Sequence, residues 1–175
     1  MEKHVAIFAA GCFWGVEATY RQVPGVLQTE VGYTGGSTKN PTYKNVGTGK
    51  TGHVEALKIT FDPTVVSYEF LVDLFFKSHD STTLNRQGPD VGTQYRSAIF
   101  YLSEEQKTTA EQIKSNYQES LNHKDRRIVT EIRPAGTFYP AEEYHQQYFE
   151  KFGFHPCVNF FPLPKKTGTL SKLQS

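Results

Sequence analysis

The chain has 175 residues and a formal net charge of +1, a length that fits one domain with a sizeable core. The near-zero charge excludes a strong field for nucleic acid or an acidic membrane surface, and no segment approaches the roughly 18–20 apolar residues of a membrane span. Two cysteines are too few for a disulfide framework, and because the N-terminus leads straight into an apolar run, we expect no signal peptide. We therefore expect a reduced, cytoplasmic setting.

Helices and strands alternate along the chain. Ser67 can cap one helix, and Ser103, followed by Gln106, is close to the capping box of another. Apolar alternation over 53–61 indicates a strand stopped by an Asp-Pro pair. In chain order we predict a strand over residues 4–10, a helix over 14–22, a strand over 26–33, a loop over 35–52, a strand over 53–61, a helix over 67–78, a loop over 79–95, a strand over 96–102, a helix over 103–122, a strand over 129–133 and a helix over 141–151.

This mixture predicts an α+β domain, with helices packed on a small mixed or antiparallel sheet. We interpret residues 1–175 as one domain, with a core over about 4–153 and a proline-containing extended tail over about 154–175. The two long loops exceed ordinary connection lengths, which is typical of functional loops.

The pentapeptide Gly11–Gly15 is the most informative local feature. Cys12 follows an apolar strand and precedes a helix, so backbone N–H groups and the helix dipole favour a thiolate there. Phe13 and Trp14 place two apolar rings beside the sulfur. The pattern favours a nucleophilic thiolate next to an apolar pocket; the alternative is a small buried cysteine among core aromatics.

Polar candidates lie in or beside the two long loops. Glu55 is surrounded by apolar neighbours in its strand; if desolvated, it is a general acid near neutral pH, and the alternative is a surface carboxylate. Tyr43 and Tyr95 offer phenolic hydrogen bonds or ordinary loop packing. Asp90 can orient a substrate amide or simply form a turn.

Histidines and the second thiol complete the candidates. None of the six histidines forms an HxxxH or HExxH pair, so we expect no metal site. His145 can support the site from behind or be a packed core residue. Cys157, on the predicted tail, can approach an oxidised Cys12; a chance exposed cysteine is the alternative.

Several motifs occur in a fixed order along the chain: Gly11-Cys12-Phe13-Trp14-Gly15, Tyr33-Thr34-Gly35-Gly36, Pro41-Thr42-Tyr43, Gly52-His53-Val54-Glu55, Gly92-Thr93-Gln94-Tyr95-Arg96-Ser97-Ala98 and Tyr139-Pro140-Ala141-Glu142-Glu143-Tyr144-His145-Gln146-Gln147-Tyr148. With them the chain closely resembles the peptide methionine sulfoxide reductase A family over about residues 4–157. The resemblance implies an α+β fold with a ferredoxin-like two-layer core. It also implies an oxidoreductase that reduces the S epimer of methionine sulfoxide, free or in proteins, as a repair of oxidative damage.

The resemblance also assigns roles to residues. Cys12 matches the nucleophile and Glu55 the acid that protonates the sulfoxide oxygen. The other matches are Tyr43 and Tyr95 as hydrogen-bond donors to that oxygen, Phe13 and Trp14 as the pocket for the S-methyl group, Asp90 as a contact of the substrate backbone with His145 as its neighbour, and Cys157 as the resolving cysteine. The usual family context of the last is Gly-Tyr-Cys, whereas here it is His-Pro-Cys.

The resulting hypothesis needs no organic cofactor and no metal. Cys12 attacks the sulfoxide sulfur and becomes a sulfenic acid, which Cys157 converts to a disulfide. The resemblance implies thioredoxin as the reductant of that disulfide, and we expect a monomer with no nucleic-acid or membrane partner.

Two other classes of function remain open. A thiol peroxidase would use Cys12 on peroxide, although peroxide needs no methyl pocket such as Trp14 suggests. A non-catalytic module would bind methionine sulfoxide without consuming thiol. Comparing peroxide with a methyl sulfoxide, and counting thiols, separates the three.

Overall fold

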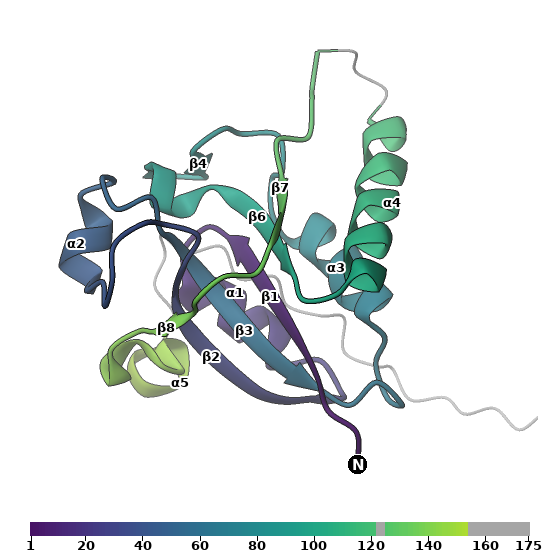
Figure 1. Cartoon of the computed structure of the whole chain (residues 1–175), viewed down its shortest axis with the longest axis horizontal. Helices are drawn as coiled ribbons and strands as arrows, with labels where there is room; N and C mark the ends of the chain where they lie inside the picture. Colours follow the sequence, from purple (N-terminus) through teal and green to yellow (C-terminus); the bar gives the residue numbers. More distant parts are fainter. Residues whose placement is uncertain (122–124, 154–175) are drawn as a thin grey trace, which may run out of the picture.

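The computed structural model describes residues 1–121 and 125–153 (Figure 1). The predicted tail with Cys157, and the predicted helix end at residue 122, lie outside these residues. No helix in the described part is both long and apolar enough to span a membrane. The elements are β1 (His4–Ala10), α1 (Phe13–Tyr20), β2 (Val26–Thr34), α2 (Tyr43–Gly47), β3 (Val54–Phe61), α3 (Tyr68–Ser78), β4 (Arg86–Gln87), β5 (Asp90–Val91), the 3-10 turn η1 (Thr93–Tyr95), β6 (Ser97–Tyr101), α4 (Glu104–Ser120), β7 (Glu131–Pro134), β8 (Tyr139–Pro140), the 3-10 turn η2 (Glu143–His145) and α5 (Tyr148–Phe152).

The main sheet has six strands in the order β7-β6-β1-β3-β2-β8. Neighbours pair antiparallel except β6 with β7, so the sheet is mixed. Two split β-α-β units, β1-α1-β2 and β3-α3-β6, interleave so that each places a strand between the two strands of the other. This is the ferredoxin-like two-layer arrangement, and it confirms the predicted fold class.

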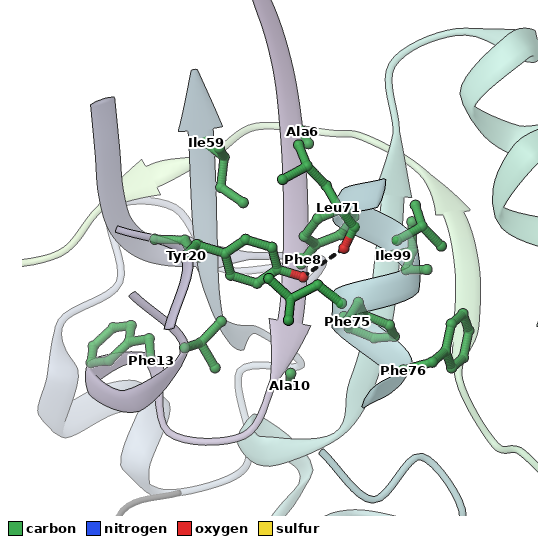
Figure 2. Packing of buried hydrophobic residues seen from close by; sticks show 14 of the residues in the cluster. Ala6, Phe8, Ala10, Phe13, Tyr20, Ile59, Leu71, Phe75, Phe76 and Ile99 are labelled. Atoms are coloured by element: carbon green, nitrogen blue, oxygen red, sulfur yellow. Dashed lines mark hydrogen bonds between the residues drawn. The ribbon is translucent and has the colours of Figure 1, made fainter. Parts of the chain in front are cut away.

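Helices α1, α3 and α4 cover one face of the sheet. Alternate residues of β1, such as Ala6 and Phe8, point into this layer and pack with side chains of α1 and α3 (Figure 2). Tyr20 at the end of α1 is fully buried, and its hydroxyl donates to the Leu71 carbonyl of α3 at 2.8 Å. The buried phenol thus joins the two helices across the core.

On the opposite face of the sheet, the described residues that cover the strands belong to an extended segment. Ile7 and Ala9 of β1 join Phe100 in a smaller buried cluster on that side. Ala135 and Phe138, from the extended connection between β7 and β8, pack over it. This connection leads the chain across the sheet to β8, which pairs with β2 and precedes η2 and α5.

Local signals place the long helices correctly. The Ser67 hydroxyl accepts the Phe70 N–H, and the Ser103 hydroxyl accepts the Gln106 N–H, so both predicted caps are confirmed. The predicted loops are not featureless: the first contains α2, capped by Thr42, and the second contains the β4–β5 hairpin and η1.

The predicted helix over 141–151 is wrong. The Gln146 side chain instead pairs with the backbone of Val31, accepting its N–H and donating to its carbonyl, both at 2.9 Å. Gln147 then adopts a left-handed backbone conformation, φ 47°, which interrupts any helix before α5. The Gln146 side chain therefore fastens this segment to β2 instead of lying on the surface of a continuous helix.

Candidate active site

Cys12 lies at the turn between β1 and α1, as the N-cap residue of the helix. Gly11 makes this turn with φ 99°, a conformation that disfavours residues with a side chain. A Cβ atom at Gly11 would also lie 2.7 Å from Cγ of Gln87, because the β4–β5 hairpin packs directly against the turn. The glycine is required both by the backbone and by this close approach.

The charge state of Cys12 differs from the sequence-based prediction. Burial, then the neighbouring charges of Glu55 and Asp90, raise the pKa of the Cys12 thiol far above its ordinary value. Backbone N–H groups of α1 lower the pKa, but by less than burial raises it. The expected resting thiolate is therefore wrong, and Cys12 is a neutral thiol at neutral pH in this structure.

Glu55 is buried beside the turn, with only 3% of its surface exposed. Its Oε1 accepts the backbone N–H of Phe13 at 3.1 Å, which ties the carboxyl to the first residue of α1. Burial raises the pKa of Glu55 to about 8, with Asp90 adding to the rise and the Phe13 bond opposing it. Of the two alternatives that the sequence leaves open, the structure shows the desolvated carboxyl, and the surface carboxylate is wrong.

Three further predicted residues surround this pair. Tyr43 starts α2, Asp90 starts β5 and Tyr95 ends η1, so the two long loops deliver them from separate parts of the chain. Burial, together with the charges of Glu55 and Cys12, raises the pKa of Tyr43 to about 12. Burial and Glu55 also raise the pKa of Tyr95. Both phenols are therefore protonated hydrogen-bond donors at neutral pH.

An aromatic wall stands on the α1 side of the site. The Trp14 indole N–H donates to Nδ1 of His145 at 2.9 Å, and its ring stacks on Tyr148 with centroids 3.8 Å apart and planes 6° apart. Because an indole only donates, this bond requires the neutral His145 tautomer with its proton on Nε2. Burial lowers the pKa of His145, which favours that neutral form. The Phe13 ring lies 5.2 Å from the imidazole.

The arrangement places a thiol, a protonated carboxylic acid and two phenols beside aromatic rings. Such a set can attack an electrophilic atom, protonate an oxygen and hold a small apolar group. The described residues contain no group of three or more His, Cys, Asp or Glu side chains placed to hold a metal ion. Cys157, the predicted resolving thiol, lies outside the described residues.

Sequence reasoning missed three residues that support the site. Tyr148 stacks on Trp14, and its position three residues after His145 on the same segment was the available signal. Glu142 accepts hydrogen bonds from Tyr33 and from the backbone of Tyr43. Neither Glu142 nor Tyr33 carries a sequence signal for this contact, since they are 109 residues apart.

Known proteins are similar to this chain over most of its length. A family model described as peptide methionine sulfoxide reductase matches residues 4–167. The chain is 61% identical over 146 residues to the peptide methionine sulfoxide reductase MsrA of Methanothermobacter thermautotrophicus, covering 83% of this chain and 86% of that protein.

Solved structures are similar as well. The reduced form of Mxr1 from Saccharomyces cerevisiae superposes with a TM-score of 0.84 at 36% identity, covering 91% of this chain and 92% of the other. Mxr1 in complex with Trx2 superposes with a TM-score of 0.59 at 26% identity, covering 84% and 85%. This chain therefore belongs to the peptide methionine sulfoxide reductase family.

Proposed function

We propose that this protein reduces the S epimer of methionine sulfoxide, free or in proteins, with Cys12 as the nucleophile and Glu55 as the acid. The observation that carries the assignment of roles is the buried Glu55 carboxyl, held on the Phe13 N–H next to the Cys12 turn. A sulfoxide oxygen leaves poorly unless it is protonated, and a carboxyl with a pKa of about 8 holds that proton at neutral pH.

The reduction step balances in atoms and protons. Cys12 Sγ forms a bond to the sulfoxide sulfur while Glu55 gives its proton to the sulfoxide oxygen. The proton of the Cys12 thiol then passes to the Glu55 carboxylate. The hydroxyl then passes to Cys12 Sγ as the methionine S–O bond breaks. The products are methionine and a Cys12 sulfenic acid, with no proton gained or lost overall. Tyr43 and Tyr95 donate hydrogen bonds to the oxygen during its transfer.

Substrate binding uses the aromatic wall. Phe13 and Trp14 hold the S-methyl group, with Trp14 fixed by its bond to His145 and by stacking on Tyr148. Asp90, the first residue of β5, contacts the substrate backbone. A dry apolar pocket for the methyl group is what separates a sulfoxide reductase from a thiol peroxidase.

Recycling in this proposal uses the second thiol and a partner. Cys157 attacks the sulfenic sulfur, releasing water and forming a Cys12–Cys157 disulfide, and thioredoxin reduces that disulfide by thiol exchange. The complex of Mxr1 with Trx2 supports this choice of reductant. We place the reaction in the cytoplasm, in a monomer.

The decisive experiment is single-turnover reduction of resolved methyl sulfoxide epimers by the fully reduced protein, with free thiols counted before and after. We expect reduction of the S epimer alone and the loss of two thiols. Cys12→Ser should abolish reduction, because the nucleophile is lost. Appreciable reduction by that variant, or preference for the R epimer, would refute the proposal.

Removing the second thiol tests the recycling step separately. Cys157→Ser should reduce about one equivalent of S-sulfoxide and then stop, because thioredoxin has no disulfide to attack. The measurement is product formed per enzyme with thioredoxin, its reductase and NADPH present. Sustained cycling by this variant would show that Cys157 is not the resolving residue while leaving the reductase assignment intact.

A further inference from the structure

The Glu142 carboxylate joins two elements of the site, β2 and α2. Its Oε1 accepts the Tyr33 hydroxyl of β2 at 2.9 Å, and its Oε2 accepts the backbone N–H of Tyr43, the first residue of α2, at 3.1 Å. The first N–H groups of a helix lack intrahelical partners, so the carboxylate supplies what the helix cannot.

The backbone of Glu142 holds a second part of the site. Its carbonyl accepts the His145 N–H at 3.0 Å, which closes η2 and sets the position of the imidazole under Trp14. The Tyr43 and His145 rings meet with their centroids 4.4 Å apart. One residue therefore fixes both rings of this contact, one through its side chain and one through its backbone.

Glu142 is itself held in place and charged. The Ala141 N–H donates to the Val31 carbonyl, so the residue before Glu142 is fastened to the edge of β2. Burial raises the pKa of Glu142, but its own backbone N–H and the bonds from Tyr43 and Tyr33 lower it further, so the carboxyl is ionised at neutral pH.

Tyr33 lies between this carboxylate and the Glu55 acid. It is paired directly opposite Glu55 in the sheet, its ring packs on Phe13 at 5.7 Å, and its hydroxyl points to Glu142. The site thus contains two carboxyl groups in opposite states: Glu55 kept protonated in an apolar environment, and Glu142 kept ionised by donors.

We propose that Glu142 is a positioning residue: its carboxylate fixes the start of α2, and through it the Tyr43 phenol, relative to Cys12 and Glu55. This inference rests on the proposed function, in which Tyr43 donates to the transferred oxygen. Glu142 does not touch the substrate; it acts through Tyr43, so its effect must disappear when the Tyr43 hydroxyl is absent.

A double-mutant cycle tests this dependence. Glu142→Gln, Tyr43→Phe and the double variant are compared for the saturated single-turnover rate of S-sulfoxide reduction. Glu142→Gln should lower the rate about tenfold, the effect of losing one hydrogen bond to a charged group. The double variant should be no slower than Tyr43→Phe alone. Glu143→Gln, an adjacent carboxylate with its side chain 90% exposed, is the matched control and should keep the wild-type rate.

The outcomes separate the inference from the proposed function. Two results would overturn the positioning role while the wild-type protein still reduces the S epimer. One is a rate loss in the double variant equal to the product of the losses in the two single variants. The other is a wild-type rate for Glu142→Gln. A wild-type protein inactive on both epimers would instead refute the function. If Glu142→Gln does not fold, Tyr33→Phe replaces it: it removes one of the two bonds and should slow the step about threefold, again only when Tyr43 is present.

Discussion

At the scale of single residues, burial controls the chemistry of the site through two neighbouring groups. Cys12 and Glu55 are both neutral at pH 7, because the apolar surroundings penalise a thiolate and a carboxylate in the same small volume. A neutral pair holds two protons, which are the two that the proposed oxygen transfer moves. The helix N-terminus beside Cys12 is then positioned to stabilise the thiolate as it forms during attack, when Glu55 has passed its proton to the oxygen.

The acid role of Glu55 has a defined pH signature. Glu55→Gln keeps an oxygen for the Phe13 N–H but has no proton to give, so the single-turnover rate should fall about 100-fold or more. In the wild-type protein only the protonated form donates, so this rate should fall as pH rises through about 8. The variant should lack that step in its pH profile.

A carboxylate remote from the site is the control for this change. Glu69→Gln, on the exposed first turn of α3, should keep both the rate and the pH profile of the wild type. Stopped-flow measurement of methionine formation between pH 6 and 9 checks both variants. A Glu55→Gln rate within a few-fold of the wild type would remove the acid role.

At the scale of elements, a buried carboxylate attaches the segment before α5 to α1. Glu17 of α1 is 1% exposed and accepts the Gln147 N–H at 2.6 Å and the Thr29 hydroxyl at 2.7 Å. These bonds hold Gln147 in its left-handed conformation and so place Tyr148 against Trp14. The apolar wall of the site therefore depends on the contact between Glu17, one turn after Trp14 on α1, and Gln147.

Truncating Glu17 should weaken both stability and substrate binding. Glu17→Ala leaves the Gln147 N–H and the Thr29 hydroxyl without their buried acceptor, so the free energy of unfolding should fall by about 3 kcal/mol. KM for the sulfoxide should rise, because Tyr148 no longer holds Trp14. Urea denaturation and initial rates at several substrate concentrations measure the two effects.

An exposed ion pair on the same two elements is the comparison. Glu150→Ala removes the partner of Arg21, 2.7 Å away and 60% exposed, and should cost less than about 1 kcal/mol with KM unchanged. Equal losses in the two variants would mean that Glu17 has no special role in holding the segment.

At the scale of the whole molecule, the site is built where the two split units and the two long loops converge. The β1–α1 turn brings Cys12, β3 brings Glu55, and the loops bring Tyr43, Asp90 and Tyr95. Such a site requires a buried acid, and burying an ionisable group costs folding free energy. The catalytic arrangement should therefore reduce the stability of the protein at alkaline pH.

Because burying an ionised Glu55 costs folding free energy, we predict that Glu55→Gln stabilises the protein at high pH. The pKa of Glu55 is about 8 in the folded protein and near 4.3 in an unfolded chain, so folding takes up a proton between these values. The stability contributed by the protonated group is complete below the unfolded pKa and is lost as pH rises through the folded pKa. At pH 8 the variant should be more stable than the wild type by about 4 kcal/mol, and near pH 4 the two should be alike.

Urea denaturation at both pH values measures the difference. A gain that is the same at the two pH values would show that it comes from packing rather than from ionisation. The result also bears on function, since the same substitution is expected to lower the rate and raise the stability.

The fold was largely predictable because its signals are local. The caps at Ser67 and Ser103, the apolar run of β1 and the alternation in β3 are all signals within a few residues, so the sequence is enough to locate these elements. The helix predicted over 141–151 failed because its competitor is distant: Gln146 pairs with Val31, 115 residues earlier in the chain. Local periodicity cannot register a partner that only folding brings near.

The same distinction applies to the site. The residues alone predict an α+β domain and place Cys12 at a strand-to-helix turn, whereas the ferredoxin-like core was predicted through the family resemblance. The charge states of Cys12, Glu55 and Glu142 became visible only in the folded structure, as did the contacts of Tyr33 and Tyr148. The physical reason is that a pKa depends on burial and on neighbouring charges, and both are properties of the folded chain.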